Sequence, residues 1–296
     1  PGAPDGWQVD GTVDEEQVER YRAYPGSDVL WIAGVDATED ALLGNVYHRT
    51  PDEGWFKSRT LDQGLHVHDE AEFGGAVYAC GSGGTWDDYN AGHIGSLLWA
   101  SDDGGETFEL VEKQLNDTVG DRRFTQMVPL SDGLYLFGYS TNADYLADEF
   151  LMAHYDGVAL AWLDGLERQW AFDSYPLSPE LGLVHAIYYP VFGAATWRMT
   201  ALRPGGQETE VEALGDVTLA DLFALGDGRW LVLVQDGNEV GAAATGAYQV
   251  HLTADLETFT PVAAFQDDVG VRSLAYWRGA LYLGRADGSV WRADPL

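Results

Sequence analysis

The stretch SDDGGETF, residues 101–108, is an acidic, glycine-rich turn between two apolar segments. SLLWAS (96–101) leads into it and FELVEK (108–113) continues from it. An aspartate in such a turn can accept hydrogen bonds from nearby backbone amides, and glycines allow positive φ angles. We therefore predict that these two apolar segments are neighbouring strands joined by the turn.

Two further strand candidates precede this pair, LHVHDEAEF (65–73) and AVYACG (76–81), so the region predicts a four-stranded meander. Similar turn-and-strand patterns recur along the chain: YPGSDVLWIAG (24–34), FGGAVYACG (73–81), LSDGLYLFG (130–138), LGDGRWLVLV (225–234) and WRGALYLGR (277–285). Their strands are 47 to 57 residues apart, except for one gap of 96 that fits a further unit around VHAIYYPVFGAATWRM (184–199). Six units of about 49 residues are typical of propeller blades.

The two ends of the chain complement each other. GSVWRADPL (288–296) stops just after a third strand, whereas GWQVDGTV (6–13) has no unit of its own. We expect the N-terminal segment to form the outer strand of the last blade, which removes an exposed sheet edge. The predicted fold is an all-β, six-bladed β-propeller of four-stranded antiparallel blades, a single domain over residues 1–296 with residues 1–5 as the remainder of a linker.

Ser101, Asp103, Gly105, Thr107 and Phe108 follow the pattern S-x-D-x-G-x-T-[FW]. This pattern resembles the Asp-box, or BNR repeat, of the sialidase-like β-propeller superfamily, and no particular member of it. TADLETF (253–259) and TPDEGWF (50–56) are weaker versions of the same pattern. In that superfamily the box implies a structural role, with the aromatic residue anchoring the turn between strands.

The resemblance raises the alternative of a sialidase-like glycoside hydrolase. That family implies an arginine triad that grips a carboxylate, a Tyr/Glu nucleophile pair, an acidic proton donor and an early R-I-P motif. The corresponding place here is YRAYPG (21–26), which keeps Arg22 but not the tripeptide, while Arg123 and Arg272 begin later inner strands. The other interpretation is that these arginines pair with the abundant carboxylates.

The composition is strongly acidic, with 48 Asp and Glu against 16 Lys and Arg and a formal net charge of −32. Such a chain repels nucleic acid and anionic membranes, and it has no apolar run of the roughly 18 residues that would cross a bilayer. We therefore predict no nucleic-acid partner and no membrane insertion. The carboxylates are interpreted as a solvated surface, with calcium binding as the alternative, although no EF-hand spacing occurs.

The chain opens PGAPDG without a methionine, so we expect a mature form that has lost a targeting segment. A secreted or cell-surface location follows as an expectation, with anchoring through a removed N-terminal segment left open. The single cysteine, Cys80, excludes an internal disulfide, and its apolar neighbours favour a buried thiol.

Four stretches are longer than a hairpin needs and are expected to carry function: 36–45, 82–95, 139–149 and 236–247. In a propeller such loops lie on the face opposite the Asp-box turns. The second stretch, SGGTWDDYNAGHIG, is the richest, because aromatic rings beside carboxylates and amides suit a glycan or a peptide. Packing of its aromatic residues on a neighbouring blade is the alternative. The residues predicted to bind ligand are Glu19, Trp86, Asp87, Tyr89, His93, Arg123, Asp221 and Arg272.

A metal site formed by three histidines is a separate hypothesis. His66 and His68 alternate along one inner strand, and His185 has a comparable place in the fourth unit. Their imidazoles would bind zinc or copper if His93, Asp221 or Glu19 completed the coordination shell. Histidines that only make hydrogen bonds in the core or near the mouth of the central channel are the commoner case. No nucleophile motif, phosphate loop or dinucleotide fingerprint occurs. The sequence thus favours a binding module over an enzyme.

Overall fold

The computed structural model describes residues 6–24, 27–34, 39, 42–144, 147–163, 171–178, 182–191, 194–203, 207–210, 214, 217–236 and 246–294. Strands dominate this part, and its one α-helix is α1 (Trp86–Ala91). No helix within it has the length and hydropathy that a membrane span requires.

Contacts divide the chain into two compact units. Unit 1 comprises Pro1–Thr12, Gln17–Pro25 and Trp170–Leu296, and unit 2 comprises Val13–Glu16 and Gly26–Gln169. The strands of unit 2 are β3 (Leu30–Gly34), β4 (Leu43–Arg49), β5 (Trp55–Asp62), β6 (Gly64–Phe73), β7 (Ala76–Gly83), β8 (His93–Ser101), β9 (Glu109–Gln114), β10 (Gly120–Leu130), β11 (Gly133–Thr141), β12 (Ala147–Tyr155) and β13 (Leu160–Trp162).

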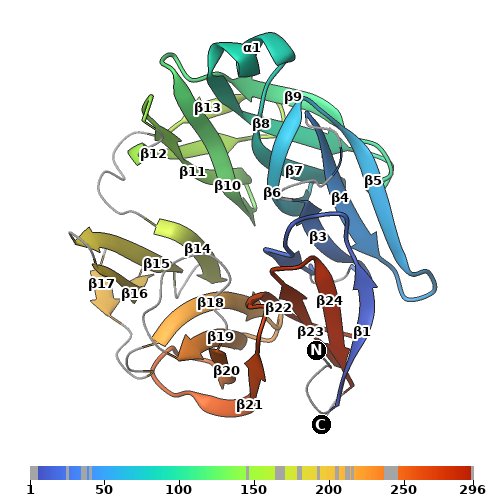
Figure 1. Cartoon of the computed structure of the whole chain (residues 1–296), viewed down its shortest axis with the longest axis vertical. Helices are drawn as coiled ribbons and strands as arrows, with labels where there is room; N and C mark the ends of the chain where they lie inside the picture. Colours follow the sequence, from blue (N-terminus) through green and yellow to red (C-terminus); the bar gives the residue numbers. More distant parts are fainter. Residues whose placement is uncertain are drawn as a thin grey trace. The chain divides into compact units, whose positions relative to one another are not determined.

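Unit 2 is built from antiparallel meanders in which consecutive strands are neighbours (Figure 1). The strands β6 to β9 form one of them and match the four segments predicted around the turn at 101–108, with Phe108 just before β9, so that prediction is confirmed. The strands β10 to β13 form another, and a short parallel bridge between β8 and β10 connects the two. The middle strands β7 and β8 are almost entirely buried, whereas outer strand β9 alternates between exposed and half-buried residues.

Unit 1 repeats the four-stranded arrangement. Its strands are β1 (Trp7–Thr12), β2 (Tyr21–Arg22), β14 (Ala171–Ser178), β15 (Gly182–Val191), β16 (Ala194–Arg203), β17 (Gln207–Glu210), β18 (Val217–Ala224), β19 (Trp230–Asp236), β20 (Gly246–Thr253), β21 (Thr260–Asp267), β22 (Val271–Trp277), β23 (Ala280–Arg285) and β24 (Ser289–Ala293). Within the predicted segment 184–199, residues 184–191 belong to β15 and residues 194–199 to β16.

The N-terminal strand β1 pairs antiparallel with β24, from Trp7 opposite Ala293 to Thr12 opposite Ser289. It forms the edge of the sheet β1-β24-β23-β22 (Figure 1). Trp7 also packs against Phe265 of β21, with ring centroids 5.8 Å apart. The segment therefore lies beside the last strand, as the sequence predicted.

The turn at 101–108 is held by Asp103. Its Oδ1 accepts the backbone N–H groups of Glu106 and Thr107, both at 3.0 Å, and its Oδ2 accepts the Thr107 hydroxyl at 2.5 Å. These bonds, led by the Thr107 hydroxyl, hold the pKa of Asp103 well below its usual range. Gly105 has φ +91°, and a Cβ there would lie 2.5 Å from Trp31, so this position requires glycine.

The weaker pattern at 253–259 uses the same donors and acceptors. Oδ1 of Asp255 accepts the N–H groups of Glu257 and Thr258 at 2.9 and 2.8 Å. Leu256 stands where the glycine would be, with φ 60°, and its side chain belongs to the core cluster that includes Trp230. Burial of this leucine therefore accompanies a backbone conformation that normally favours glycine.

We expect Asp103→Ala to lower the melting temperature, because the turn loses the acceptor of four hydrogen bonds, including one from the Ser101 hydroxyl. Differential scanning calorimetry measures the change. The neighbouring exposed Asp102, changed to alanine, is the matched control and should melt close to the wild type. Equal melting of the two variants would contradict a structural role for Asp103.

Candidate functional site

The stretch 82–95, predicted to be a loop, contains helix α1, which begins beyond the end of β7 and precedes β8 (Figure 1). Thr85 caps it: its hydroxyl accepts the Asp88 N–H at 3.2 Å, and Asp88 Oδ2 accepts the Thr85 N–H at 2.8 Å. Gly92 ends the helix in the left-handed region with φ 76°. This reciprocal cap satisfies backbone groups that a helix of six residues would otherwise leave open.

Contacts from neighbouring strands hold α1 at both ends. Lys113 of β9 donates to Asp88 Oδ2 at 2.6 Å and to Gln63 Oε1 at 2.9 Å. These bonds, Lys113 first and Thr85 second, lower the pKa of Asp88 to about 2. At the other end, the Gly120 N–H donates to the Gly92 carbonyl at 2.8 Å. The helix is therefore fixed, and the charge of Lys113 is neutralised.

Trp86 and Tyr89 project from this fixed helix into solvent, with 58% and 45% of their surfaces exposed. Their ring centroids are 5.8 Å apart and the planes meet at 83°. The segment between β9 and β10 adds the exposed residues Leu115, Asp117 and Val119. Of these, Val119 lies next to the end of the helix, since a Cβ on Gly92 would lie 3.1 Å from its side chain. We call Trp86, Asp87, Tyr89, Leu115, Asp117 and Val119 the α1 face.

The α1 face and the turn at 101–108 lie at opposite ends of β8. This is the arrangement that the sequence predicted for a ligand-binding loop and a structural turn. The sequence did not single out Leu115 or Val119, because isolated aliphatic residues after a strand carry no signal of their own.

His93 begins β8, directly after α1. Its Nδ1 lies 3.0 Å from the Asn116 carbonyl oxygen, which can only accept, so in the neutral ring Nδ1 carries the proton and Nε2 is an acceptor. Asn116 is held in turn by donating to the Asp121 and Thr141 carbonyls. The structure thus places His93 beside the α1 face with a defined tautomer.

The other predicted residues of unit 2 lie on β6 and β10, the first strands of their meanders. Arg123 of β10 pairs with Asp121 and lies over the Tyr139 ring, with 5.2 Å between Cζ and the ring centroid. His66 and His68 of β6 stack with ring centroids 5.7 Å apart. Within the described residues no group of three or more His, Cys, Asp or Glu side chains is placed to hold a metal ion.

The remaining predicted residues belong to unit 1. Glu19 precedes β2 and Arg272 lies in β22, both half-buried. His185 lies in β15, and its side chain is outside the described part.

Asp221, predicted as a ligand-binding group, is only 2% exposed. Its two carboxylate oxygens accept backbone N–H groups, one from Leu222 and one from Leu274 of β22, both at 2.8 Å. Asp69 of β6 makes the equivalent bond to the Met127 N–H of β10, also at 2.8 Å. Asp221 therefore joins β18 to β22, which is a structural position.

The burial of Asp221 makes stability depend on pH. Burial raises its pKa from 3.8 to about 7, against the opposing effect of the Leu274 N–H and of Arg20 and Arg22. Between these two values the folded chain holds a proton that the unfolded chain releases, so the free energy of unfolding falls as pH rises from about 4 to about 7.

Asp221→Asn should remove this contribution, because the amide does not ionise. Urea unfolding at several pH values across this window should show the variant gaining relative to the wild type as pH rises. Asp227→Asn, at an exposed carboxyl whose pKa is lowered by Arg229, is the control and should not show this gain. Parallel pH profiles for wild type and Asp221→Asn would refute the assignment.

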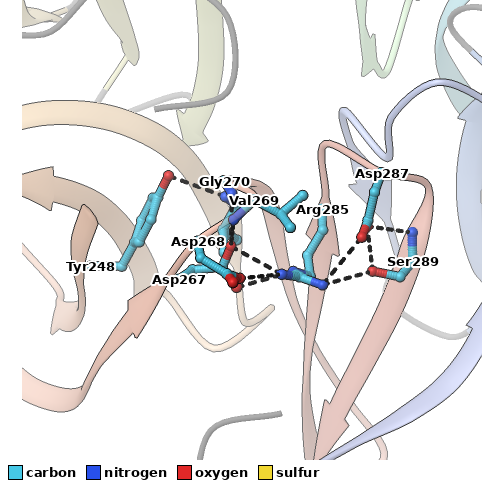
Figure 2. A network of polar contacts seen from close by, with 9 residues as sticks. Tyr248, Asp267, Asp268, Val269, Gly270, Arg285, Asp287 and Ser289 are labelled. Atoms are coloured by element: carbon cyan, nitrogen blue, oxygen red, sulfur yellow. Dashed lines mark hydrogen bonds and ion pairs between the residues drawn. The ribbon is translucent and has the colours of Figure 1, made fainter. Parts of the chain in front are cut away.

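A polar network surrounds Arg285 in unit 1 (Figure 2). The guanidinium donates to Asp267 Oδ2 at 3.0 Å and Oδ1 at 3.3 Å, and further to Asp268, Asp287 and Ser289. Asp267 also accepts the Val269 and Gly270 N–H groups at 2.8 and 2.7 Å. Because Arg285 is buried and engaged by all these acceptors, the network stabilises the sheet and offers no free cation to a ligand.

No family model matches the chain, and no curated protein sequence matches it. Solved structures do resemble it. An α-L-arabinofuranosidase of Fusarium graminearum superposes with a TM-score of 0.61 at 13% identity, covering 96% of this chain and 95% of that one. Virginiamycin B lyase from Staphylococcus aureus gives 0.55 at 8% identity, covering 98% and 99%. A neuraminidase-like protein of A/little yellow-shouldered bat gives 0.51 at 9% identity, covering 98% of each chain.

These structures are β-propellers, and the chain therefore has a β-propeller fold. The identities are low enough that the likeness concerns the fold alone.

Proposed function

We propose that the protein is an exported β-propeller that acts as a binding module and holds a glycan or protein ligand on the α1 face. The observation that carries this proposal is the exposed pair Trp86 and Tyr89 on a helix fixed at both ends. Large rings held in place bind with little loss of side-chain entropy, and neighbouring exposed apolar side chains often mark an interaction site.

The finer features of the fold belong to the same proposal. Six blades follow from the repeat spacing, and the pairing of β1 with β24 supports closure of the ring by the N-terminal strand. The bonding of Asp103 and of Asp255 supports an Asp-box function for both turns. The turn at 101–108 and the α1 face lie at opposite ends of β8, so a structural role for the turn leaves the α1 face free to bind the ligand.

A His-ligated metal site is the second candidate, favoured by the stacked rings of His66 and His68. Metal analysis of protein purified without chelator tests it. Stoichiometric zinc or copper that is lost in the double variant His66→Ala, His68→Ala would support this candidate, and metal-free protein would exclude it.

The binding proposal is tested with a printed array of glycans and peptides probed by the full chain. Spots bound by the wild type should be lost in the double variant Trp86→Ala, Tyr89→Ala and kept in Tyr276→Ala, which removes another exposed aromatic residue. Binding that survives the double variant would overturn the α1 face as the site. Hydrolysis of chromogenic glycosides would instead indicate a glycoside hydrolase. Against this alternative, Arg123, one of the arginines expected to grip the substrate carboxylate, already pairs with Asp121.

A further inference from the structure

The two rings of the α1 face are set at a right angle. Their planes meet at 83° with centroids 5.8 Å apart, an edge-to-face contact in which the two ring faces point in nearly perpendicular directions. A sugar is best received by one flat ring face, whereas an ammonium or guanidinium group is attracted to the negative faces of rings that surround it. The geometry of the pair therefore favours a cation.

The charges beside the rings point the same way. Asp87 and Asp117 are both exposed on the α1 face. Lys113, the basic residue that contacts the helix, is neutralised by Asp88. The chain as a whole carries a formal charge of −32, which attracts positively charged partners over a distance.

From these observations we infer that the ligand of the α1 face is a lysine- or arginine-rich segment of a partner protein; this inference rests on the proposed function. A cationic group of the segment packs on the exposed ring surfaces of Trp86 and Tyr89, with Asp87 compensating its charge. The exposed aliphatic side chains of Leu115 and Val119 contact the methylene stems of neighbouring lysines and arginines.

Fluorescence anisotropy of the full chain with a labelled peptide of alternating lysine and glycine tests the inference. The double variant Trp86→Leu, Tyr89→Leu keeps apolar area but removes both rings, and should weaken binding about tenfold. Asp87→Asn should weaken it about threefold at low salt, and less at high salt.

Matched controls separate this site from general attraction to an acidic protein. Tyr276→Leu removes an aromatic side chain that is 42% exposed elsewhere, and Asp102→Asn removes one exposed charge elsewhere. Both should leave the affinity within about twofold of the wild type. Circular dichroism confirms that each variant is folded, and Asp87→Asn alone remains informative if the double variant is not.

The outcomes are distinct. Equal losses in the α1-face variants and in their controls would show general electrostatic attraction and overturn the inference. Soluble neutral polysaccharide that binds in a Trp86-dependent way, with no ring-dependent peptide binding, would overturn the cationic ligand but leave the binding module standing. If removal of the rings weakens neither peptide binding nor polysaccharide binding, both this inference and the α1 face as the binding site are overturned.

Discussion

Replacing Arg285 by methionine should lower the free energy of unfolding by about 3 to 5 kcal/mol, since it leaves a buried carboxylate without its partner. Arg285 donates two hydrogen bonds to Asp267 and lies over the Trp291 ring, 4.0 Å from Cζ to the centroid. Asp267 keeps only the two backbone donors of Val269 and Gly270 in the variant. Urea denaturation followed by tryptophan fluorescence measures the loss.

Arg229→Met is the control for this experiment. Arg229 pairs with Asp227, but about half of each side chain is exposed. Water already solvates both charges there, so stability should hardly change. Arg285→Lys should recover only part of the loss, because a single ammonium cannot reach all the acceptors that the planar guanidinium contacts. A similar stability for the Arg285 and Arg229 variants would show that burial does not decide the value of these pairs.

Deletion of residues 1–12, which removes β1, is the second change with a large expected effect. It breaks the pairing from Trp7 to Thr12 along β24 and removes the Trp7 ring from Phe265. We expect the free energy of unfolding to fall by roughly 3 to 6 kcal/mol, from the lost hydrogen bonds and apolar contacts together. The exposed edge of β24 should also make the truncated protein prone to association.

Thermal unfolding and size-exclusion chromatography of this truncation measure both effects. A shorter truncation that removes residues 1–5 leaves β1 in place and is the control. Equal melting of the two truncated proteins would be evidence against closure by the N-terminal strand.

Much of the strand pattern could be predicted from the sequence, because it depends on interactions between neighbours in the chain. The segments LHVHDEAEF and AVYACG are strands β6 and β7 of a meander, separated by a two-glycine turn at Gly74 and Gly75 with positive φ. The turn at 101–108 could also be predicted from the sequence, because Asp103 bonds to residues no more than four positions away.

The candidate site was only partly predictable. Trp86, Asp87, Tyr89 and His93 were selected from the stretch 82–95, and the structure gathers them around α1. The helix itself was missed, although Thr85 and Asp88 carry the spacing of a capping box. The support from Lys113 could not be foreseen, since it comes from a strand 25 residues away and depends on how β8 pairs with β9.

By itself the sequence determined the alternation of strands and turns, the acidic surface and the aromatic loop, all of which follow from local composition and spacing. Only the tertiary structure decided which polar residues became buried partners. Glu15 is an example: it is buried, with Oε1 accepting Asn45 Nδ2 at 2.5 Å and the Tyr47 hydroxyl at 2.9 Å. Asp221 and Arg285 are others, and their partners lie 53 and 18 residues away. The physical reason is that solvated carboxylates all have similar surroundings, so the sequence does not distinguish one from another. A carboxylate acquires a defined role only where folding removes water and brings distant donors to it.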